Sequence, residues 1–166
     1  MSIPRLVETH GWSHFRELEY QVCEKVASEA ATTAMEGGWA LIDAGGGVVV
    51  DLDEDGNEVY SQRKVDVLKR EGLGKVVFLK RDVGYLVNRT SGDSNRPSLS
   101  ASRTFQEIMA RRAPWYEAAA DYVLDATGGA IEARVKSKRD ITEEALAYFY
   151  GVAGELPSSM PTRAAE

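Results

Sequence analysis

Trp39–Val50, WALIDAGGGVVV, is the stretch that decides the fold predicted from this sequence. A short apolar run ends in three consecutive glycines, and a second apolar run follows them. The first run is typical of a buried strand in a parallel sheet. Ligands of open α/β sheets bind at the carboxyl ends of such strands, where glycine permits positive φ and lets a ligand approach bare N–H groups. We therefore expect Gly45, Gly46 and Gly47 to form a ligand-facing loop, with a plain turn as the alternative.

The amino-acid composition limits the classes of protein to which this chain can belong. The 166 residues suffice for one domain with a core, and 43% hydrophobic and 28% charged residues are ordinary for a globular protein. The net charge of -6 and the lack of a basic stripe argue against a nucleic-acid partner. No apolar run approaches the roughly 18 residues that span a membrane. The single cysteine, Cys23, and the lack of a signal-peptide h-region indicate a cytoplasmic protein without a thiolate metal site.

The N-terminal third is predicted to be helical. Residues 2–10 form a short helix that Gly11 breaks. A second helix follows, whose apolar face is predicted to consist of Phe15, Leu18, Val22, Val26, Ala30 and Ala34. Arg16 and Glu19 are three residues apart on this helix, and on spacing alone they are interpreted as a solvated surface salt bridge. The helix is expected to span residues 14–35.

The insertion DLDEDGNEVYSQ, residues 51–62, imitates a calcium loop at its start, with Asp51, Asp53, Asp55 and then Gly56. Its twelfth position is Gln62 rather than the bidentate glutamate that calcium needs. The segment also follows a predicted strand rather than a helix. A polar hairpin that turns at residues 55–57 is therefore the favoured interpretation.

The remaining chain alternates helices with strands, which predicts an α/β fold with a parallel sheet. Helices are expected at 61–71, 82–89, 104–112, 114–120 and 141–153, and further strands at 74–79 and 121–125. The last helix is expected to begin at a capping box of Asp140 and Glu143 and to bury its apolar residues. A loop of small polar residues occupies 90–100, and the tail 155–166 is expected to be disordered. The three parallel strands are few for such a sheet.

Four arginines stand out in this acidic protein: Arg16, Arg89, Arg96 and Arg112. Guanidinium groups suit the bidentate binding of carboxylate and phosphate. No Ser/His/Asp or Cys/His arrangement is visible. The sequence therefore favours positioning and charge stabilisation, as in phosphoryl transfer, over covalent catalysis.

An ordered set of motifs resembles the shikimate kinase family over roughly residues 2–153. The set begins with Gly11-Trp12-x-x-Phe15-Arg16-x-x-Glu19 and the Gly45–Gly47 run. It continues with Arg89, Arg96-Pro97, and Arg112-x-x-x-Tyr116 followed by Ala120-Asp121. The resemblance implies a three-layer parallel sheet of nucleoside-monophosphate-kinase type. It also implies transfer of the γ-phosphate of ATP, with Mg²⁺, to the shikimate 3-hydroxyl, a step of chorismate and aromatic amino acid biosynthesis.

The resemblance also implies a role for each matching residue. Arg16 and Arg112 would grip the shikimate carboxylate, and Glu19 would orient Arg16 and the substrate. The Gly45–Gly47 backbone would face the ring hydroxyls and the γ-phosphate. Arg96 would act as a catalytic lid residue over the phosphoryl group and, with Arg89, would contact ATP.

The chain departs from the family pattern at its start. The family places a strand, a phosphate-binding loop, a helix and a second strand before the Gly11-Trp12 motif. No segment of the 166 residues fits GxxxxGK[ST]. We therefore expect an incomplete domain over residues 1–154 that lacks the first βαβ unit and the family's magnesium ligands. Asp43, where the family is usually small or apolar, is either a magnesium contact or a neutral buried acid.

Three hypotheses follow. The first is a shikimate kinase whose sequence is truncated, a monomer when complete, and the motif set favours it. The second is a non-catalytic shikimate-binding remnant, or half of a split kinase whose missing strand a second chain supplies. The third is another small-molecule kinase of the same fold. Under each of them we expect the 166 residues alone not to phosphorylate shikimate.

Overall fold

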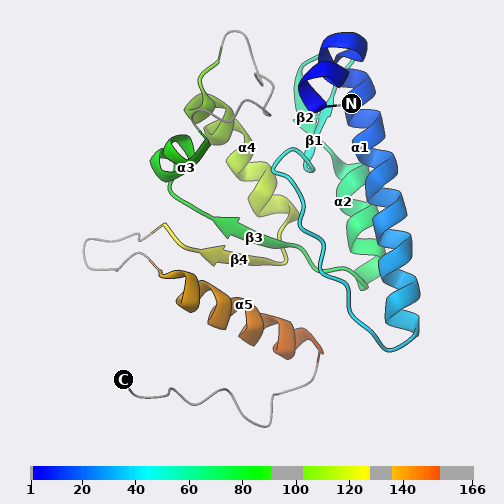
Figure 1. The fold of residues 1–166 in the computed structure, drawn as a ribbon, viewed down its shortest axis with the longest axis vertical. Helices are drawn as coiled ribbons and strands as arrows, with labels where there is room; N and C mark the ends of the chain where they lie inside the picture. Colours follow the sequence, from blue (N-terminus) through cyan, green and yellow to red (C-terminus); the bar gives the residue numbers. More distant parts are fainter. Residues whose placement is uncertain (1, 91–102, 128–135, 154–166) are drawn as a thin grey trace. The chain divides into compact units, whose positions relative to one another are not determined.

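The structure, a computed structural model, describes residues 2–90, 103–127 and 136–153 (Figure 1). The chain divides into two compact units. Unit 1 consists of Met1–Phe78 and Val83–Val123, and unit 2 of Leu79–Asp82 and Leu124–Glu166. The expected α/β class is confirmed, since helices alternate with strands and two strands run parallel.

Helix α1 (Ile3–Met35) contains a break at the predicted position. Gly11 has φ 80° and ψ 169° inside the helix, a conformation that residues with a side chain rarely adopt. The helical segments before and after Gly11 correspond to the two predicted helices. The break and the end of the second helix at Met35 are confirmed.

The predicted apolar face of α1 is only partly right: Phe15, Leu18, Val26 and Ala30 are half-buried, whereas Val22 and Ala34 are exposed. The buried residues are Arg16, Cys23 and Ala27, and Val22 is 58% exposed. Helix α2 (Gln62–Lys69) lies beside α1 (Figure 1). The buried positions Arg16, Cys23 and Ala27 each follow directly after a predicted apolar residue, so the inward stripe of α1 is rotated by about one residue and includes a charged side chain that Glu19 pairs.

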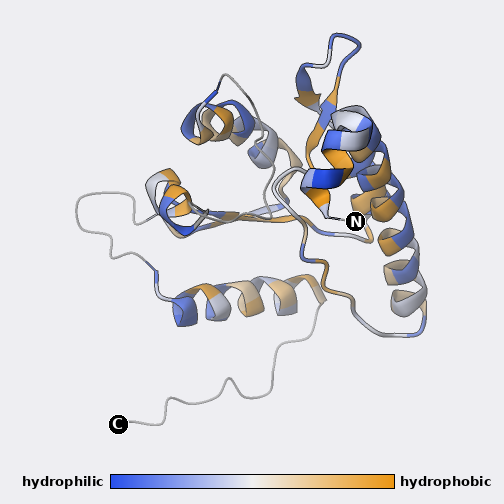
Figure 2. Ribbon diagram, turned by 45° about the horizontal axis from the view of Figure 1, so that its top comes forward, coloured by the Kyte–Doolittle hydropathy of each residue, from blue (hydrophilic) through white to orange (hydrophobic). Residues whose placement is uncertain are grey.

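The predicted hairpin is confirmed. Strands β1 (Val50–Leu52) and β2 (Glu58–Tyr60) pair antiparallel, with Val50 opposite Tyr60 and Leu52 opposite Glu58. In the turn, the Asp53 carboxylate accepts hydrogen bonds from the backbone N–H groups of Asp55 at 3.0 Å and Asn57 at 2.7 Å. The turn is mostly hydrophilic (Figure 2). The acidic residues of the insertion thus stabilise a turn.

The strand predicted at residues 39–44 is wrong. This segment has no regular structure, Leu41 is fully exposed, and Trp39 is 55% exposed. Residues 46–49 form a turn, and the next strand begins only at Val50. A strand needs a hydrogen-bonded neighbour, and none of the described strands pairs with this segment. None of Gly45, Gly46 and Gly47 has positive φ, so the expected conformational reason for these glycines is also wrong.

Strands β3 (Val77–Lys80) and β4 (Tyr122–Asp125) form a parallel pair. The direction follows from the Val76 carbonyl, which accepts from Tyr122 N–H at 3.2 Å, and the Lys80 carbonyl, which accepts from Ala126 N–H at 2.9 Å. Two of the three expected parallel strands are therefore found. The predicted helices beside them are α2, which continues through the short 3₁₀ turn η1 (Arg70–Gly72), and α3 (Val83–Thr90).

Helix α4 (Phe105–Ala119) is one helix, where two were predicted with a break at Pro114. Proline removes only one helical hydrogen bond, and buried residues on both sides of it hold the helix together. These residues are Ile108, Arg112, Tyr116 and Ala119. The helix starts with a capping box, in which Thr104 and Glu107 bond each other's backbone N–H groups.

Helix α5 (Lys138–Ala153) begins three residues before the predicted start at 141. Its cap is Ser137 with Asp140: the Asp140 carboxylate accepts from Ser137 N–H at 2.7 Å, and the Ser137 hydroxyl accepts from Asp140 N–H at 3.2 Å. The predicted Asp140–Glu143 box is therefore wrong. The helix has no buried residue within its described length, so its expected burial is wrong as well. The loop at 91–100 and the tail 155–166 lie outside the described residues.

The core of unit 1 joins the hairpin to α2 and α4. It consists of Val49, Val50, Val65, Tyr116 and Ala119. The Gly45–Gly47 run leads directly into this core, so its backbone is held where α1, α4 and the hairpin meet. No helix in the described ranges combines the length and apolarity of a membrane span.

Candidate functional site

The turn that contains Gly46 and Gly47 is held by side chains from two helices. The Tyr116 hydroxyl of α4 donates a hydrogen bond to the Gly46 carbonyl at 2.8 Å. Nη1 of Arg16, on α1, donates to the Gly47 carbonyl at 3.3 Å. Two segments that the sequence separates widely therefore meet at the predicted glycine loop.

Arg16 is buried, with 4% of its surface exposed. Its Nη1 lies 2.8 Å from Glu19 Oε2. Its guanidinium carbon lies 5.3 Å from the ring centroid of Trp12 and 5.4 Å from that of Phe15, within cation–π range. The interpretation of Arg16 and Glu19 as a solvated pair is therefore wrong, because aromatic rings and the glycine turn cover the arginine.

Lys64 completes this cluster and was missed by the sequence analysis. Its side chain is fully buried; Nζ donates to Glu19 Oε2 at 2.7 Å and to the Val50 carbonyl at 2.6 Å. Glu19 therefore bridges two cations, Arg16 and Lys64. A lysine in the first turn of a helix normally indicates a solvated face, so residue type gave no signal of this role.

Gly47 allows these charges to approach the backbone. A Cβ atom added there would lie 2.7 Å from Arg16 Nη1 and 3.2 Å from Glu19 Oε1. At Gly46 an added Cβ would lie 3.3 Å from the Tyr116 hydroxyl, whereas at Gly45 nothing lies within 4 Å. A side chain at position 47 would therefore push the end of the Arg16 side chain away from its contacts with Glu19 and the Gly47 carbonyl.

Arg112, on α4, is also buried, and its partner is Glu58 of the hairpin. Nε of Arg112 donates to Glu58 Oε2 at 3.1 Å, and Nη2 bonds Oε1. Nη2 of Arg111 donates to the backbone carbonyl of Glu58 at 2.5 Å. Burial alone would lower the pKa of Arg112, but the Glu58 carboxylate outweighs this and raises it. Glu58 was missed from the sequence because the hairpin was interpreted only as a polar insertion.

A second ion-pair group borders the first. Asp51 accepts from Arg63 Nε at 2.7 Å, from Arg63 Nη2 at 3.0 Å and from the Ser61 hydroxyl at 2.8 Å. Arg63 Nη1 also donates to Glu17 at 2.8 Å. Burial would raise the pKa of Asp51, but the hydrogen bonds from Arg63 and Ser61 outweigh it and lower the pKa below its ordinary value.

A small cavity of about 80 Å³ opens at the cluster. Its lining consists of Trp12, Arg16, Leu52, Gly56 and Glu58. Within the described residues, Nε of Arg16 is buried and has no hydrogen-bond partner. An anionic ligand oxygen is a suitable partner for such a donor. The lining of the cavity therefore includes a cationic, an aromatic and a carboxylate side chain, from Arg16, Trp12 and Glu58.

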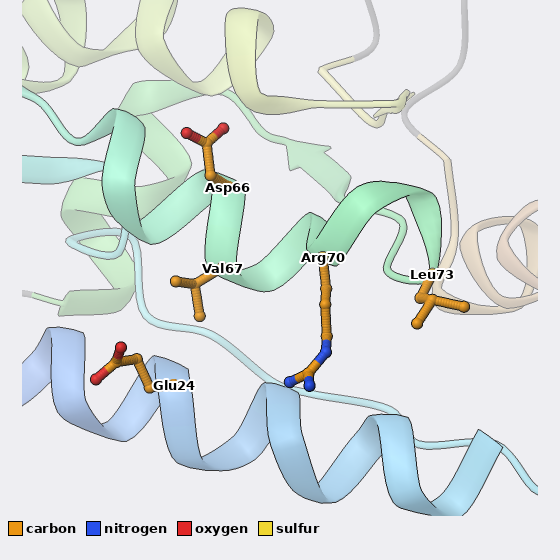
Figure 3. A pocket seen from close by; sticks show the side chains of 5 residues that line it. All are labelled: Glu24, Asp66, Val67, Arg70 and Leu73. Carbon is orange, nitrogen blue, oxygen red and sulfur yellow. The ribbon is translucent and has the colours of Figure 1, made fainter. Parts of the chain in front are cut away.

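A larger hollow of unit 1, about 970 Å³, lies elsewhere between α1, α2 and η1 (Figure 3). Glu24 comes from α1, Asp66 and Val67 come from α2, and Arg70 and Leu73 complete the lining. The side chain of Arg70 extends toward α1 in this view. Its lining contains no paired arginines and none of the predicted site residues, so we assign it no chemistry.

The structure brings together Arg16, Glu19, Gly46, Gly47 and Arg112 from the predicted set. Gly45 and Asp43 are exposed, so the hypothesis that Asp43 is a buried acid is wrong. Arg89 is exposed in the last turn of α3, and Arg96 lies outside the described residues. Across residues 2–90, 103–127 and 136–153, no group of three His, Cys, Asp or Glu side chains is arranged to hold a metal ion.

Comparisons with known proteins agree first on the fold. The structure resembles that described as "Shikimate kinase from Acinetobacter baumannii in complex with shikimate", with a TM-score of 0.60 and 22% sequence identity. The match covers 92% of this chain and 70% of that chain.

The family follows from sequence. The family model described as shikimate kinase matches residues 1–144, and the chain belongs to this family. A shikimate kinase of Leptospira biflexa is 41% identical over 125 residues, 75% of this chain and 64% of the relative. That of Leptospira borgpetersenii is 34% identical over 127 residues, covering 75% and 65%. The chain thus spans slightly less than two thirds of these relatives.

Proposed function

We propose that this protein acts in shikimate phosphorylation, transferring the γ-phosphate of ATP to the 3-hydroxyl of shikimate, and that the described residues form the acceptor side of the site. The observation that carries the proposal is the placement of two buried arginines, Arg16 and Arg112, on helices that both contact the Gly46–Gly47 turn. Arg16 bonds the turn directly, and Tyr116, one helical turn after Arg112, bonds it from α4. Family membership supports the substrate.

The proposed mechanism is positioning. The guanidinium groups of Arg16 and Arg112 bind the acceptor carboxylate, and Glu19 with Lys64 fixes the orientation of Arg16. The turn then presents backbone to the acceptor hydroxyls. Arg96 is proposed to meet the transferring phosphoryl group, and Arg89 to contact the adenine.

ATP and Mg²⁺ belong to the proposal as family properties. No group of three His, Cys, Asp or Glu side chains among the described residues is arranged to hold a metal ion, and no residue is proposed as a magnesium ligand. Nucleotide binding is therefore assigned to no residue beyond Arg89 and Arg96. The proposal also includes a cytoplasmic monomer; the buried free thiol of Cys23 fits a reducing compartment.

A second candidate function is binding of shikimate without phosphorylation, either as a remnant or as half of a split kinase. It is supported by one observation: Arg16 and Arg112, the two residues proposed to bind the acceptor carboxylate, are both buried and ion-paired, which binding alone requires.

Calorimetry on the 166-residue chain tests the proposal. Shikimate should bind, its methyl ester should bind at least about tenfold more weakly, and Arg112→Lys should cause a similar loss, because lysine cannot form a bidentate pair. Arg5→Lys, at an exposed position of α1, is the matched control and should leave binding unchanged. Equal binding of acid and ester would contradict the proposed carboxylate site.

An assay that couples ADP release to NADH oxidation separates the two candidate functions. Shikimate binding without ATP binding or turnover favours the non-catalytic function. Multiple turnovers by this chain would overturn our expectation that these residues alone are inactive. No binding of either ligand by a folded chain would argue against both functions.

A further inference from the structure

The cations of the site are all matched by the chain's own carboxylates. Arg16 and Lys64 share Glu19, Arg63 pairs with Asp51 and Glu17, and Arg112 pairs with Glu58. A ligand carboxylate that enters this cluster adds a negative charge to a balanced set. Binding is therefore favoured if one internal carboxylate gives up its place.

Glu58 occupies the ligand-binding edge of Arg112. Its two carboxylate oxygens bond Nε and Nη2 side-on, which is the bidentate geometry that arginine uses for a bound carboxylate. Arg112 is 3% exposed, so little of its guanidinium is open to a second anion. A ligand carboxylate cannot take this edge while Glu58 holds it.

Glu58 is more readily displaced than Glu19. Glu19 is bonded by two cations, one of them the fully buried Lys64, whereas the ion pair of the Glu58 carboxylate is with Arg112. Glu58 is also the first residue of the three-residue strand β2, beside the hydrophilic turn of the hairpin. The backbone of β2 is held, because Tyr60 packs against the core and Arg111 bonds the Glu58 carbonyl, so displacement needs only the Glu58 side chain to rotate away from Arg112.

The vacated position adjoins the second arginine. Glu58 and Arg16 line the same cavity, and Nε of Arg16 is the buried donor without a partner among the described residues. A carboxylate that replaced that of Glu58 would bond Arg112 and lie beside Arg16. In this structure the Glu58 carboxylate bonds Arg112, and Nε of Arg16 has no hydrogen-bond partner among the described residues.

We propose that Glu58 is an internal competitor of the acceptor carboxylate: it holds Arg112 when the site is empty and is displaced when an acceptor binds. This inference rests on the proposed function for the identity of the acceptor. Glu58 thereby sets the specificity of the site. A ligand displaces the Glu58 carboxylate only if it contacts Arg16 as well as Arg112 and so binds more tightly than Glu58 does.

Calorimetric titration of Glu58→Gln tests this competition. The substitution keeps the shape of the side chain and removes its charge, so shikimate should bind about tenfold more tightly than to the unchanged chain. Shikimate methyl ester, which lacks the carboxylate, should show no such gain. Glu54→Gln, an exposed carboxylate on the same hairpin, is the matched control and should leave both affinities unchanged.

A second variant covers the case in which Glu58→Gln fails to fold. Glu58→Asp keeps the charge but shortens the reach to Arg112, and it should tighten binding by a smaller factor. Unchanged or weaker shikimate binding by the folded variants would overturn the competition and would instead make Glu58 a residue that positions Arg112.

Benzoate, a carboxylate without ring hydroxyls, separates the inference from the proposed function. If neither chain binds shikimate but Glu58→Gln gains affinity for benzoate, the proposed acceptor is wrong and the competition stands. If Glu58→Gln gains affinity for neither acid, the competition is wrong, and shikimate binding by the unchanged chain still decides the proposed function.

Discussion

Two adjacent regions of this protein reverse the usual relation between hydropathy and burial. Buried charged side chains lie beside the turn at Gly46–Gly47: Arg16 bonds the Gly47 carbonyl, and Lys64, which is fully buried, shares Glu19 with Arg16. The segment directly before it, residues 39–44, carries an apolar pattern, yet Leu41 is fully exposed. The difference lies in partners: every buried charge has an opposite charge or a carbonyl, and the apolar segment pairs with none of the described strands.

The comparison shows that hydrogen-bonding and ion-pair partners decide burial at this site. A buried ion pair is stable only when its geometry is good and its remaining polar atoms are satisfied. Lys64 meets this condition through Glu19 and the Val50 carbonyl. A strand's N–H and C=O groups require a hydrogen-bonded neighbour, and none of the described strands supplies one to residues 39–44.

The largest effect is expected at Lys64. Lys64→Met keeps most of the volume but leaves Glu19 with one cation and the Val50 carbonyl without its donor. Breaking a buried pair in this way should lower the free energy of unfolding by about 3–5 kcal/mol. Urea denaturation followed by circular dichroism measures the loss.

The matched control for Lys64 is Lys25→Met on α1. Lys25 is exposed and lies 3.9 Å from Glu29, so its substitution should change the free energy of unfolding by no more than about 0.5 kcal/mol. Equal losses for the two lysines would break the comparison, because they would show that burial adds nothing to the Lys64 contacts.

Gly47→Ala should have the next largest effect. The new Cβ would lie 2.7 Å from Arg16 Nη1, and Arg16 is too tightly enclosed to move freely. Overpacking of this kind costs about 1–3 kcal/mol. Gly45→Ala meets nothing within 4 Å and serves as the control in the same denaturation series. A smaller loss at Gly47 than at Gly45 would show that the turn yields without strain.

Asp51→Asn probes the bordering ion pairs through pH. The pKa of Asp51 is lowered in the folded protein, so its ionised form stabilises the fold above its unfolded pKa of about 3.9. This contribution is lost as the pH falls through the lower folded pKa. At pH 7 the free energy of unfolding of the variant should be about 1–2 kcal/mol lower than that of the unchanged protein. This difference should disappear as the pH falls below about 4. Asp43→Asn, in the exposed segment 39–44, is the control and should not change the free energy of unfolding at either pH. A loss for Asp51→Asn that is the same at both pH values would argue against an ionic cause.

Local patterns predicted much of the fold. The break at Gly11, the hairpin turn near Gly56 and the parallel strands β3 and β4 follow from backbone preference and short periodicity, and the structure confirms them. The helix break at Pro114 was wrong, because burial of α4 on both sides outweighs one missing hydrogen bond. Tertiary packing decides such cases, and it leaves no trace in a local window.

The candidate site was predicted as far as motifs identify residues. Arg16, Glu19, Gly46, Gly47 and Arg112 were named from the family resemblance and lie in one cluster. Lys64 and Glu58 were missed because each is an ordinary charged residue locally, on a helix and on a hairpin strand. Their roles arise only when α2 meets α1 and the hairpin meets α4, which are contacts between residues distant in sequence.

The smallest effect is expected at Leu41, whose side chain is fully exposed. Leu41→Ser should change the free energy of unfolding by no more than about 0.5 kcal/mol, since no burial is lost. Val50→Ala, at a fully buried position, should lose about 1–3 kcal/mol in the same urea titration. A loss at Leu41 comparable to that at Val50 would mean that something covers residues 39–44 in solution. Repeating the titration at several protein concentrations would then decide whether that cover is a second copy of the chain, because only an intermolecular cover makes the loss depend on concentration.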